Sequence, residues 1–164
     1  MAAGHKALVG IVGTAAAAVL ISFVPLKESG PNGPKLKPYV DPVGIVTVCD
    51  GITKNVQNRM YTKEECAALL AEELAEHAAG ALKCVTPPLT VGQRAAYTSL
   101  AYNIGVNAFC GSTVVKLHNI GNYRGACAAI SAWDKGMVGG KLTALPGLVI
   151  RRAEERAMCE KGLK

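Results

Sequence analysis

The sequence predicts an α+β fold that is mainly helical, with a small turn-rich β lobe and an apolar helix in front of it. Three observations lead to this prediction: an uncharged stretch at residues 7–26, a β-branched segment at residues 39–48, and helix-capping patterns after residue 61. A chain of 164 residues has the length of one ordinary domain. We therefore expect an N-terminal segment at residues 1–27 and a single folded domain at residues 28–164.

The N-terminal stretch at residues 7–26 reads ALVGIVGTAAAAVLISFVPL and lies between Lys6 and Lys27. Its length matches that of a helix that crosses the core of a bilayer, about 20 residues. Because five of its residues are alanine and two are glycine, we expect it to insert only weakly and to be able to leave the membrane again. An uncleaved signal anchor is the preferred interpretation. A cleaved signal peptide is the first alternative, although the small residues lie in the middle of the stretch, and a buried soluble helix is the second.

All cysteines of the chain lie downstream of this stretch, and their number is even, which indicates disulfides in an exported protein. They are Cys49, Cys66, Cys84, Cys110, Cys127 and Cys159. Six cysteines allow 15 pairings, among which the sequence does not decide. We expect neighbours in the chain to pair, Cys49 with Cys66, Cys84 with Cys110 and Cys127 with Cys159, and buried free thiols remain the alternative.

Residues 39–48, YVDPVGIVTV, are rich in β-branched side chains and are interrupted by Pro42 and Gly44, which predicts a small hairpin. Thr62 and Glu65 then form a capping box in front of a helix that extends to about residue 83, with an apolar residue at every fourth position.

A second capping box, Thr90 with Gln93, opens a helix that Gly105 closes, and Ser112 caps the next one. We expect two more helices, at residues 123–136 and 146–162, each closed by a glycine. The charged residues of the last helix indicate a solvated face with i,i+4 pairs such as Arg151 with Glu155.

Glu28 is the only carboxylate among the first forty residues, and Asp41 is the next one. Cleavage of a glycosidic bond needs a protonated carboxylic acid at the leaving oxygen and a second, ionised carboxylate across the sugar. Glu28 and Asp41 are therefore a candidate pair. Two ordinary surface acids are the alternative.

The segment at residues 35–56, KLKPYVDPVGIVTVCDGITKNV, resembles a motif of the phage-type lysozymes, glycoside hydrolase family 24. In that motif a Glu is followed by an aromatic-x-Asp and, six residues after the Asp, by a Thr; the matching positions are Tyr39, Asp41 and Thr47. The resemblance continues downstream to the secreted, cysteine-containing branch of phages and prophages, over YTKEECAALLAEEL, AYNIGVNAFCGST, RGACAAISAWDKG and GLVIRRAEERAMC.

The resemblance implies a lysozyme-like fold and an endolysin muramidase that hydrolyses the β-1,4 bond between N-acetylmuramic acid and N-acetylglucosamine in peptidoglycan. It implies that Glu28 is the general acid, that Asp41 assists the attacking water or stabilises positive charge, and that Thr47 positions that water. The apolar start resembles a signal-arrest-release anchor. We accordingly expect an exported monomer that is tethered to the inner membrane through residues 7–26, inactive there, and later released into the periplasm to cause host cell lysis.

Two positions depart from the family pattern. Its shorter form places the Glu nine residues before the Asp, where this chain has Asn32, whereas Glu28 lies thirteen residues before Asp41. We expect the extra residues, within SGPNGP, to form a looped turn. Cys49 also replaces the first glycine of the family's Thr-x-Gly-x-Gly pattern.

The net charge of +6 raises the question of nucleic acid, but no Lys/Arg cluster is longer than two residues and aromatic residues are not interleaved with the basic ones. We therefore predict no nucleic-acid partner, and the basicity suits an anionic cell wall. His5, His77 and His118 are scattered and no cysteine pair has CxxC spacing, so we predict neither a metal site nor a cofactor. A membrane-anchored cell-wall-binding or structural lysis protein without hydrolase activity is the alternative function.

Overall fold

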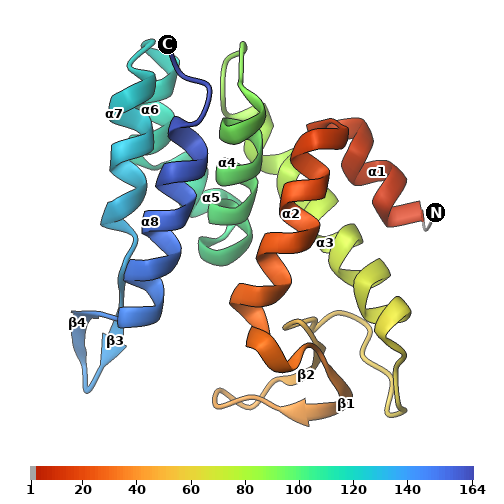
Figure 1. Ribbon diagram of the computed structural model, residues 1–164. Helices are drawn as coiled ribbons and strands as arrows, with labels where there is room; N and C mark the ends of the chain where they lie inside the picture. Colours follow the sequence, from red (N-terminus) through yellow and green to blue (C-terminus); the bar gives the residue numbers. More distant parts are fainter. Residues whose placement is uncertain (1–2) are drawn as a thin grey trace. The chain divides into compact units, whose positions relative to one another are not determined.

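The computed structural model describes residues 3–164, which form two compact units that meet in sequence between Ala75 and Glu76 (Figure 1). The first unit contains α1 (Ala3–Val12), α2 (Thr14–Glu28), the 3-10 turn η1 (Gly30–Asn32), β1 (Lys35–Val40), β2 (Val46–Cys49) and most of α3 (Lys63–Lys83). The second unit begins within α3 and contains α4 (Val91–Ile104), α5 (Val106–Cys110), α6 (Thr113–Asn119), α7 (Tyr123–Ala129), η2 (Ile130–Ala132), β3 (Lys135–Val138), β4 (Lys141–Ala144) and α8 (Pro146–Glu160). The chain is thus mainly helical, as predicted, and it has two small strand pairs, of which only the first was expected.

The uncharged N-terminal stretch forms two helices rather than one. Gly13 separates α1 from α2 and has a positive φ of 86°, a conformation that glycine adopts at little cost. One face of the two helices is buried, at Leu8, Val12, Ala16, Ala17, Leu20 and Val24. Helix α1 also lies close to α3, since a Cβ at Gly4 would come within 2.7 Å of the Glu72 backbone nitrogen. Among the helices of residues 3–164, none is both long enough and apolar enough to span a membrane.

The predicted hairpin is confirmed by the antiparallel pair β1–β2, which lies at the C-terminal end of α2 (Figure 1). Tyr39 pairs with Thr47 and Val40 with Val46, so residues 41–45 form the connecting turn. Gly44 takes a positive φ of 87° in this turn. The β lobe has its own small core, which consists of Val48, Cys49, Ile52, Tyr61 and Cys66.

The capping boxes predicted for α3 and α4 are both confirmed. The Thr62 hydroxyl accepts from the Glu65 N–H at 3.1 Å, and the Glu65 carboxylate accepts from the Thr62 N–H at 2.7 Å. Thr90 and Gln93 repeat the arrangement in front of α4, with distances of 3.1 and 2.9 Å. These reciprocal bonds satisfy backbone N–H groups that a helix start otherwise leaves without partners.

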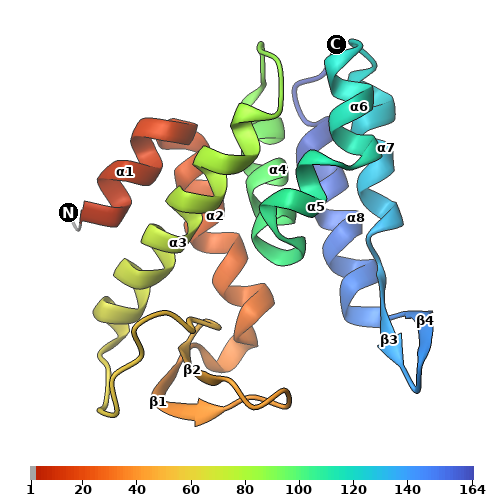
Figure 2. The same cartoon turned by 180° about the vertical axis from the view of Figure 1, so that it is seen from behind.

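In the second unit, α4 is almost completely buried from Gly92 to Ala101 and packs along α8. Helices α6 and α7 lie side by side, and α7 also packs against α8, as the rear view shows (Figure 2). The close approach of α4 and α8 explains Gly92, because a Cβ there would overlap the Met158 carbonyl oxygen. The core of this unit forms around Tyr97, Leu100 and Phe109.

The helix expected at residues 123–136 is shorter than predicted. Helix α7 ends at Ala129, and after η2 the chain forms the antiparallel hairpin β3–β4. Gly139 and Gly140 make its two-residue turn with φ values of 54° and 79°. Two consecutive residues with positive φ are the requirement of the turn that best connects twisted strands, which is why a Gly-Gly pair occurs here.

The expected disulfide pairing is confirmed. Cys49 is bonded to Cys66 in the first unit, and the second unit contains the Cys84–Cys110 and Cys127–Cys159 bonds. The Cα atoms of the three pairs are 5.2, 5.5 and 5.5 Å apart, within the usual range for disulfides.

The expected solvated face of α8 is wrong for three of its residues. Arg151, Arg152 and Glu155 are buried, and Glu155 has no exposed surface. Its carboxylate forms ion pairs with Arg151 at 3.2 Å and with Arg152 at 2.7 Å, and accepts the Ser99 hydroxyl at 2.6 Å. Burial raises the pKa of Glu155, while the two arginines and Ser99 act in the opposite direction. The pair of Arg151 with Glu155 was thus predicted correctly, but it is buried and not exposed to solvent.

Candidate functional site

Asp41 follows β1 directly and is held by the turn that it begins. Its Oδ1 atom accepts hydrogen bonds from the backbone N–H groups of Val43 at 2.9 Å and Ile45 at 2.8 Å. The backbone N–H of Asp41 in turn donates to the Ile45 carbonyl at 2.9 Å. These bonds fix the orientation of the carboxylate, whose side chain is half-buried.

Thr47 lies on β2, across from Tyr39, and is 3% exposed. Its hydroxyl donates to the Ile45 carbonyl at 3.1 Å, the same oxygen that accepts from the Asp41 backbone. The backbone of Ile45 therefore contacts both side chains, because its N–H donates to the Asp41 carboxylate and its carbonyl accepts from the Thr47 hydroxyl. Asp41 and Thr47 thus both lie on the hairpin and are both hydrogen-bonded to Ile45.

Glu28 is the last residue of α2, and its side chain is exposed. Ser29 caps the helix, with its N–H donating to the Pro25 carbonyl at 2.9 Å. The segment SGPNGP then forms η1 and leads to β1 through Gly33, which has a positive φ of 74°. The expected turn is present, and it connects the end of α2, at Glu28, to the β lobe. The ribbon shows α2 ending beside β1 and β2 (Figure 1).

Asp50 is a residue of this region to which the sequence reasoning gave no role. It is 3% exposed, and its Oδ1 accepts the Ser29 hydroxyl at 2.6 Å across 21 positions of sequence. Burial raises the pKa of the Asp50 carboxyl, and the bond from Ser29 acts in the opposite direction. The sequence shows an acid directly before Gly51, but it indicates neither the burial of Asp50 nor its bond to Ser29.

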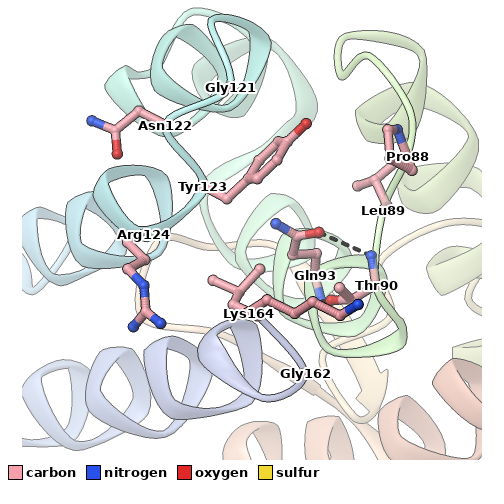
Figure 3. A pocket seen from close by; sticks show the side chains of 11 residues that line it. Pro88, Leu89, Thr90, Gln93, Gly121, Asn122, Tyr123, Arg124, Gly162 and Lys164 are labelled. Carbon is pink, nitrogen blue, oxygen red and sulfur yellow. Dashed lines mark hydrogen bonds between the residues drawn. The ribbon is translucent and has the colours of Figure 1, made fainter.

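The second unit contains a separate cavity of about 580 Å³ (Figure 3). Its walls come from the start of α4, the loop before α7 and the C-terminal tail, with Tyr123 and Gln93 as the largest half-buried and buried side chains there. All residues that line this cavity belong to the second unit, whereas Glu28, Asp41 and Thr47 belong to the first. Within residues 3–164, no group of three or more His, Cys, Asp or Glu side chains is arranged to hold a metal ion.

The sequence profile of the phage lysozyme family matches residues 30–155, well over half of the chain. The chain belongs to the phage lysozyme family. It is accordingly a glycoside hydrolase of the lysozyme type. Asp41 and Thr47 lie inside the matched range, whereas Glu28 lies two residues before it.

Individual relatives agree with this membership. The chain is 40% identical over 130 residues to the endolysin of Acyrthosiphon pisum secondary endosymbiont phage 1, covering 79% of this chain and 89% of that one. It is 35% identical over 159 residues to the SAR-endolysin of Enterobacteria phage P21, covering 94% of each. Among solved structures, the endolysin of Escherichia coli O157:H7 phage FAHEc1 aligns with a TM-score of 0.76 and 30% identity, covering 87% of this chain and 91% of that one. The lysozyme-like fold expected from the resemblance is thus confirmed.

Proposed function

We propose that this lysozyme is an endolysin muramidase in which Glu28 is the general acid, Asp41 the assisting carboxylate and Thr47 the residue that positions the attacking water. Its substrate is the β-1,4 bond between N-acetylmuramic acid and N-acetylglucosamine in peptidoglycan, and its action lyses the host cell. The endolysin relatives and the family match support the substrate and the reaction.

The observation that carries the residue roles is the hydrogen-bonded unit of Asp41, Ile45 and Thr47. Two backbone N–H groups hold Asp41 at Oδ1, which keeps the carboxylate in one orientation. The Thr47 hydroxyl hydrogen donates to Ile45, so its lone pairs are available to accept a hydrogen bond from water. A water held by the Thr47 oxygen and deprotonated by Asp41 could attack the anomeric carbon while an acid protonates the leaving oxygen.

Glu28 is the acid that the chain offers for the second half of this mechanism. It ends α2 beside the β lobe, and its neighbour Ser29 is hydrogen-bonded to Asp50, three residues beyond Thr47. This connection supports Glu28 in spite of its displaced spacing. An inverting mechanism, which the family resemblance implies, would require the two carboxyl groups to be about 6.5 to 9.5 Å apart, with a water between them.

The test is loss of turbidity of outer-membrane-permeabilised Gram-negative cells with purified, oxidised protein. We expect wild type to lyse the cells and Glu28→Gln, which cannot supply a carboxylic proton, to lose the activity. Glu64→Gln, which changes an exposed acid on α3, serves as the matched control and keeps full activity. Lysis by folded Glu28→Gln at the wild-type rate would assign the proton to another residue. Absence of lysis by a folded wild-type protein would favour a cell-wall-binding role without hydrolysis.

We further propose that residues 1–27 act as a signal-arrest-release anchor, so that the exported monomer is held at the inner membrane before it reaches the periplasm. The uncharged stretch at residues 7–26 and the similarity to the phage P21 SAR-endolysin over 94% of both chains support this. The stretch contains no cysteine, so release requires no exchange of disulfides.

Fractionation of expressing cells tests the anchor. The protein should first pellet with membranes in inactive form and, after the membrane potential is dissipated, appear in the periplasm with full activity in the absence of reductant. A released protein that stays inactive until dithiothreitol is added would contradict activation without thiol exchange. Recovery from the periplasm at all times, in a shortened form, would favour a cleaved signal peptide.

A further inference from the structure

The hydrogen bond between Ser29 and Asp50 joins two parts of the first unit that the chain itself connects only through the β lobe. The Ser29 hydroxyl donates to Asp50 Oδ1 at 2.6 Å. A bond of this length between a hydroxyl and a carboxylate is at the short, strong end of the range for side-chain hydrogen bonds. It closes a loop that contains β1, Asp41 and β2.

The Asp50 end of this bond lies on a firmly held element. The preceding Cys49 is bonded to Cys66 in the first turn of α3. Val48 and Ile52, on either side of Asp50, exchange two backbone hydrogen bonds of 2.9 Å. In the tight turn between Val48 and Ile52, Cys49 and Gly51 both take positive φ values, 58° and 88°. Asp50 is thus a fixed point at the end of the strand that carries Thr47.

The Ser29 end controls the position of the residue just before it. Ser29 is the last residue whose N–H joins the hydrogen bonding of α2, and Glu28 precedes it directly. The residues that follow form a turn with two glycines of positive φ, Gly30 at 67° and Gly33 at 74°. Such a glycine-containing turn constrains the end of α2 weakly, because glycine has access to many backbone conformations.

A small cavity of about 150 Å³ lies beside Asp50 and the end of α2. It is lined by Ile21 and Pro25 of α2, by Pro34 and Asp50, and by Lys63, Ala67, Leu70 and Ala71 of α3. Side chains that face an unfilled space lose packing contacts on that side. The Ser29–Asp50 bond therefore acts together with the packing of Val24 in holding the end of α2, which carries Glu28.

We propose that Ser29 and Asp50 are positioning residues that hold the end of α2, and with it Glu28, in register with the strand that carries Thr47. This inference rests on the proposed role of Glu28 as general acid. Neither side chain exchanges a proton with the substrate, and their effect is on the geometry of the acid. Because displacement by about 1 Å can reduce a rate by about 100-fold, loss of the bond should lower kcat by about 10- to 100-fold.

The experiment measures kcat and KM of the full oxidised chain on soluble glycan strands of peptidoglycan. The variants are Ser29→Ala, Ser29→Thr, Asp50→Ala and the double variant of Ser29→Ala with Asp50→Ala. We expect both alanine variants to lower kcat with KM within about twofold, the double variant to be no slower than the slower single one, and Ser29→Thr to restore the rate, because it keeps the hydroxyl. Ser22→Ala is the matched control, since the Ser22 hydroxyl lies on the exposed side of α2 and, within residues 3–164, bonds to carbonyls of its own helix.

The outcomes separate this inference from the proposed function. Wild-type kcat in Ser29→Ala, with only a lower melting temperature, would overturn the positioning role and leave Glu28 in place if Glu28→Gln is inactive. If the loss of kcat in the double variant equals the product of the two single losses, the positioning role is also overturned, because the two residues then act independently. Full activity of Glu28→Gln would instead overturn the proposed acid, and the positioning role with it.

Discussion

Asp41 and Ile45 are joined by hydrogen bonds in both directions, since the Ile45 N–H donates to Asp41 Oδ1 at 2.8 Å and the Asp41 N–H donates to the Ile45 carbonyl at 2.9 Å. The Thr47 hydroxyl donates to that same carbonyl at 3.1 Å. The turn therefore holds the carboxylate and the hydroxyl by means of its backbone. Substitution of either side chain should change the chemistry while the hairpin remains.

Thr47→Val should lower kcat by about 100-fold, since it removes the hydroxyl that positions water but keeps the shape of the side chain. Thr47→Ser should stay within about tenfold of wild type. The hairpin should survive in both, because the Ile45 carbonyl keeps its bond from Asp41. Steady-state kinetics on soluble glycan strands, together with circular dichroism, test this, and a fully active Thr47→Val variant would exclude the assigned role.

Arg152→Ala should destabilise the fold by about 3 to 5 kcal/mol, because it leaves the buried Glu155 without its closest ion-pair partner. Arg156→Ala is the matched control on the same helix. The Arg156 side chain is 45% exposed and pairs with Glu160 at the surface, so its loss should cost no more than about 1 kcal/mol. Urea unfolding measures both values, and equal losses would show that burial does not distinguish the two pairs.

Stability should fall as the pH is lowered below about 6.5, the ordinary pKa of histidine. Burial lowers the pKa of His118 in the folded protein, against the bond from its Nε2 to the Thr86 carbonyl. Below pH 6.5 the unfolded chain therefore binds a proton that the folded chain does not, which favours unfolding. Between pH 7.5 and 5, the melting temperature of His118→Gln should fall less than that of wild type.

Replacement of Cys127 and Cys159 by alanine should lower the free energy of unfolding by about 3 to 4 kcal/mol. The bond closes a loop with a sequence separation of 32, and chain entropy alone accounts for a loss of this size. Both residues are completely buried, and alanine leaves neither a free thiol nor another polar group in the core. Guanidinium unfolding of oxidised wild type and of the double variant tests this, and a loss below about 1 kcal/mol would contradict it.

Local patterns predicted much of the fold. The capping boxes at Thr62 and Thr90 and the hairpin around Gly44 each depend on residues within a few positions of one another. The pairing of neighbouring cysteines was also correct, although the sequence itself allowed other pairings. The break at Gly13 was missed, because a single glycine in an apolar stretch is compatible with a continuous helix as well.

What the sequence could not predict depends on contacts between distant residues. Glu155 and its arginines have the spacing of a surface ion pair, and only the packing of α4 against α8 places them inside. Ser29 and Asp50 are 21 positions apart, and no periodicity connects them. The role of Glu28 remains a prediction, since the family match begins two residues after it.

Analysis of the cleavage products tests the central claim most directly. Purified peptidoglycan is digested with wild type and with Glu28→Gln, reduced with borohydride, hydrolysed and examined for reduced sugars by mass spectrometry. Hydrolysis at the anomeric carbon of N-acetylmuramic acid makes this sugar the new reducing end. After reduction and hydrolysis, we therefore expect muramitol from the wild-type digest and none from the Glu28→Gln digest. Glucosaminitol in place of muramitol, or muramitol in equal yield from both proteins, would contradict the account.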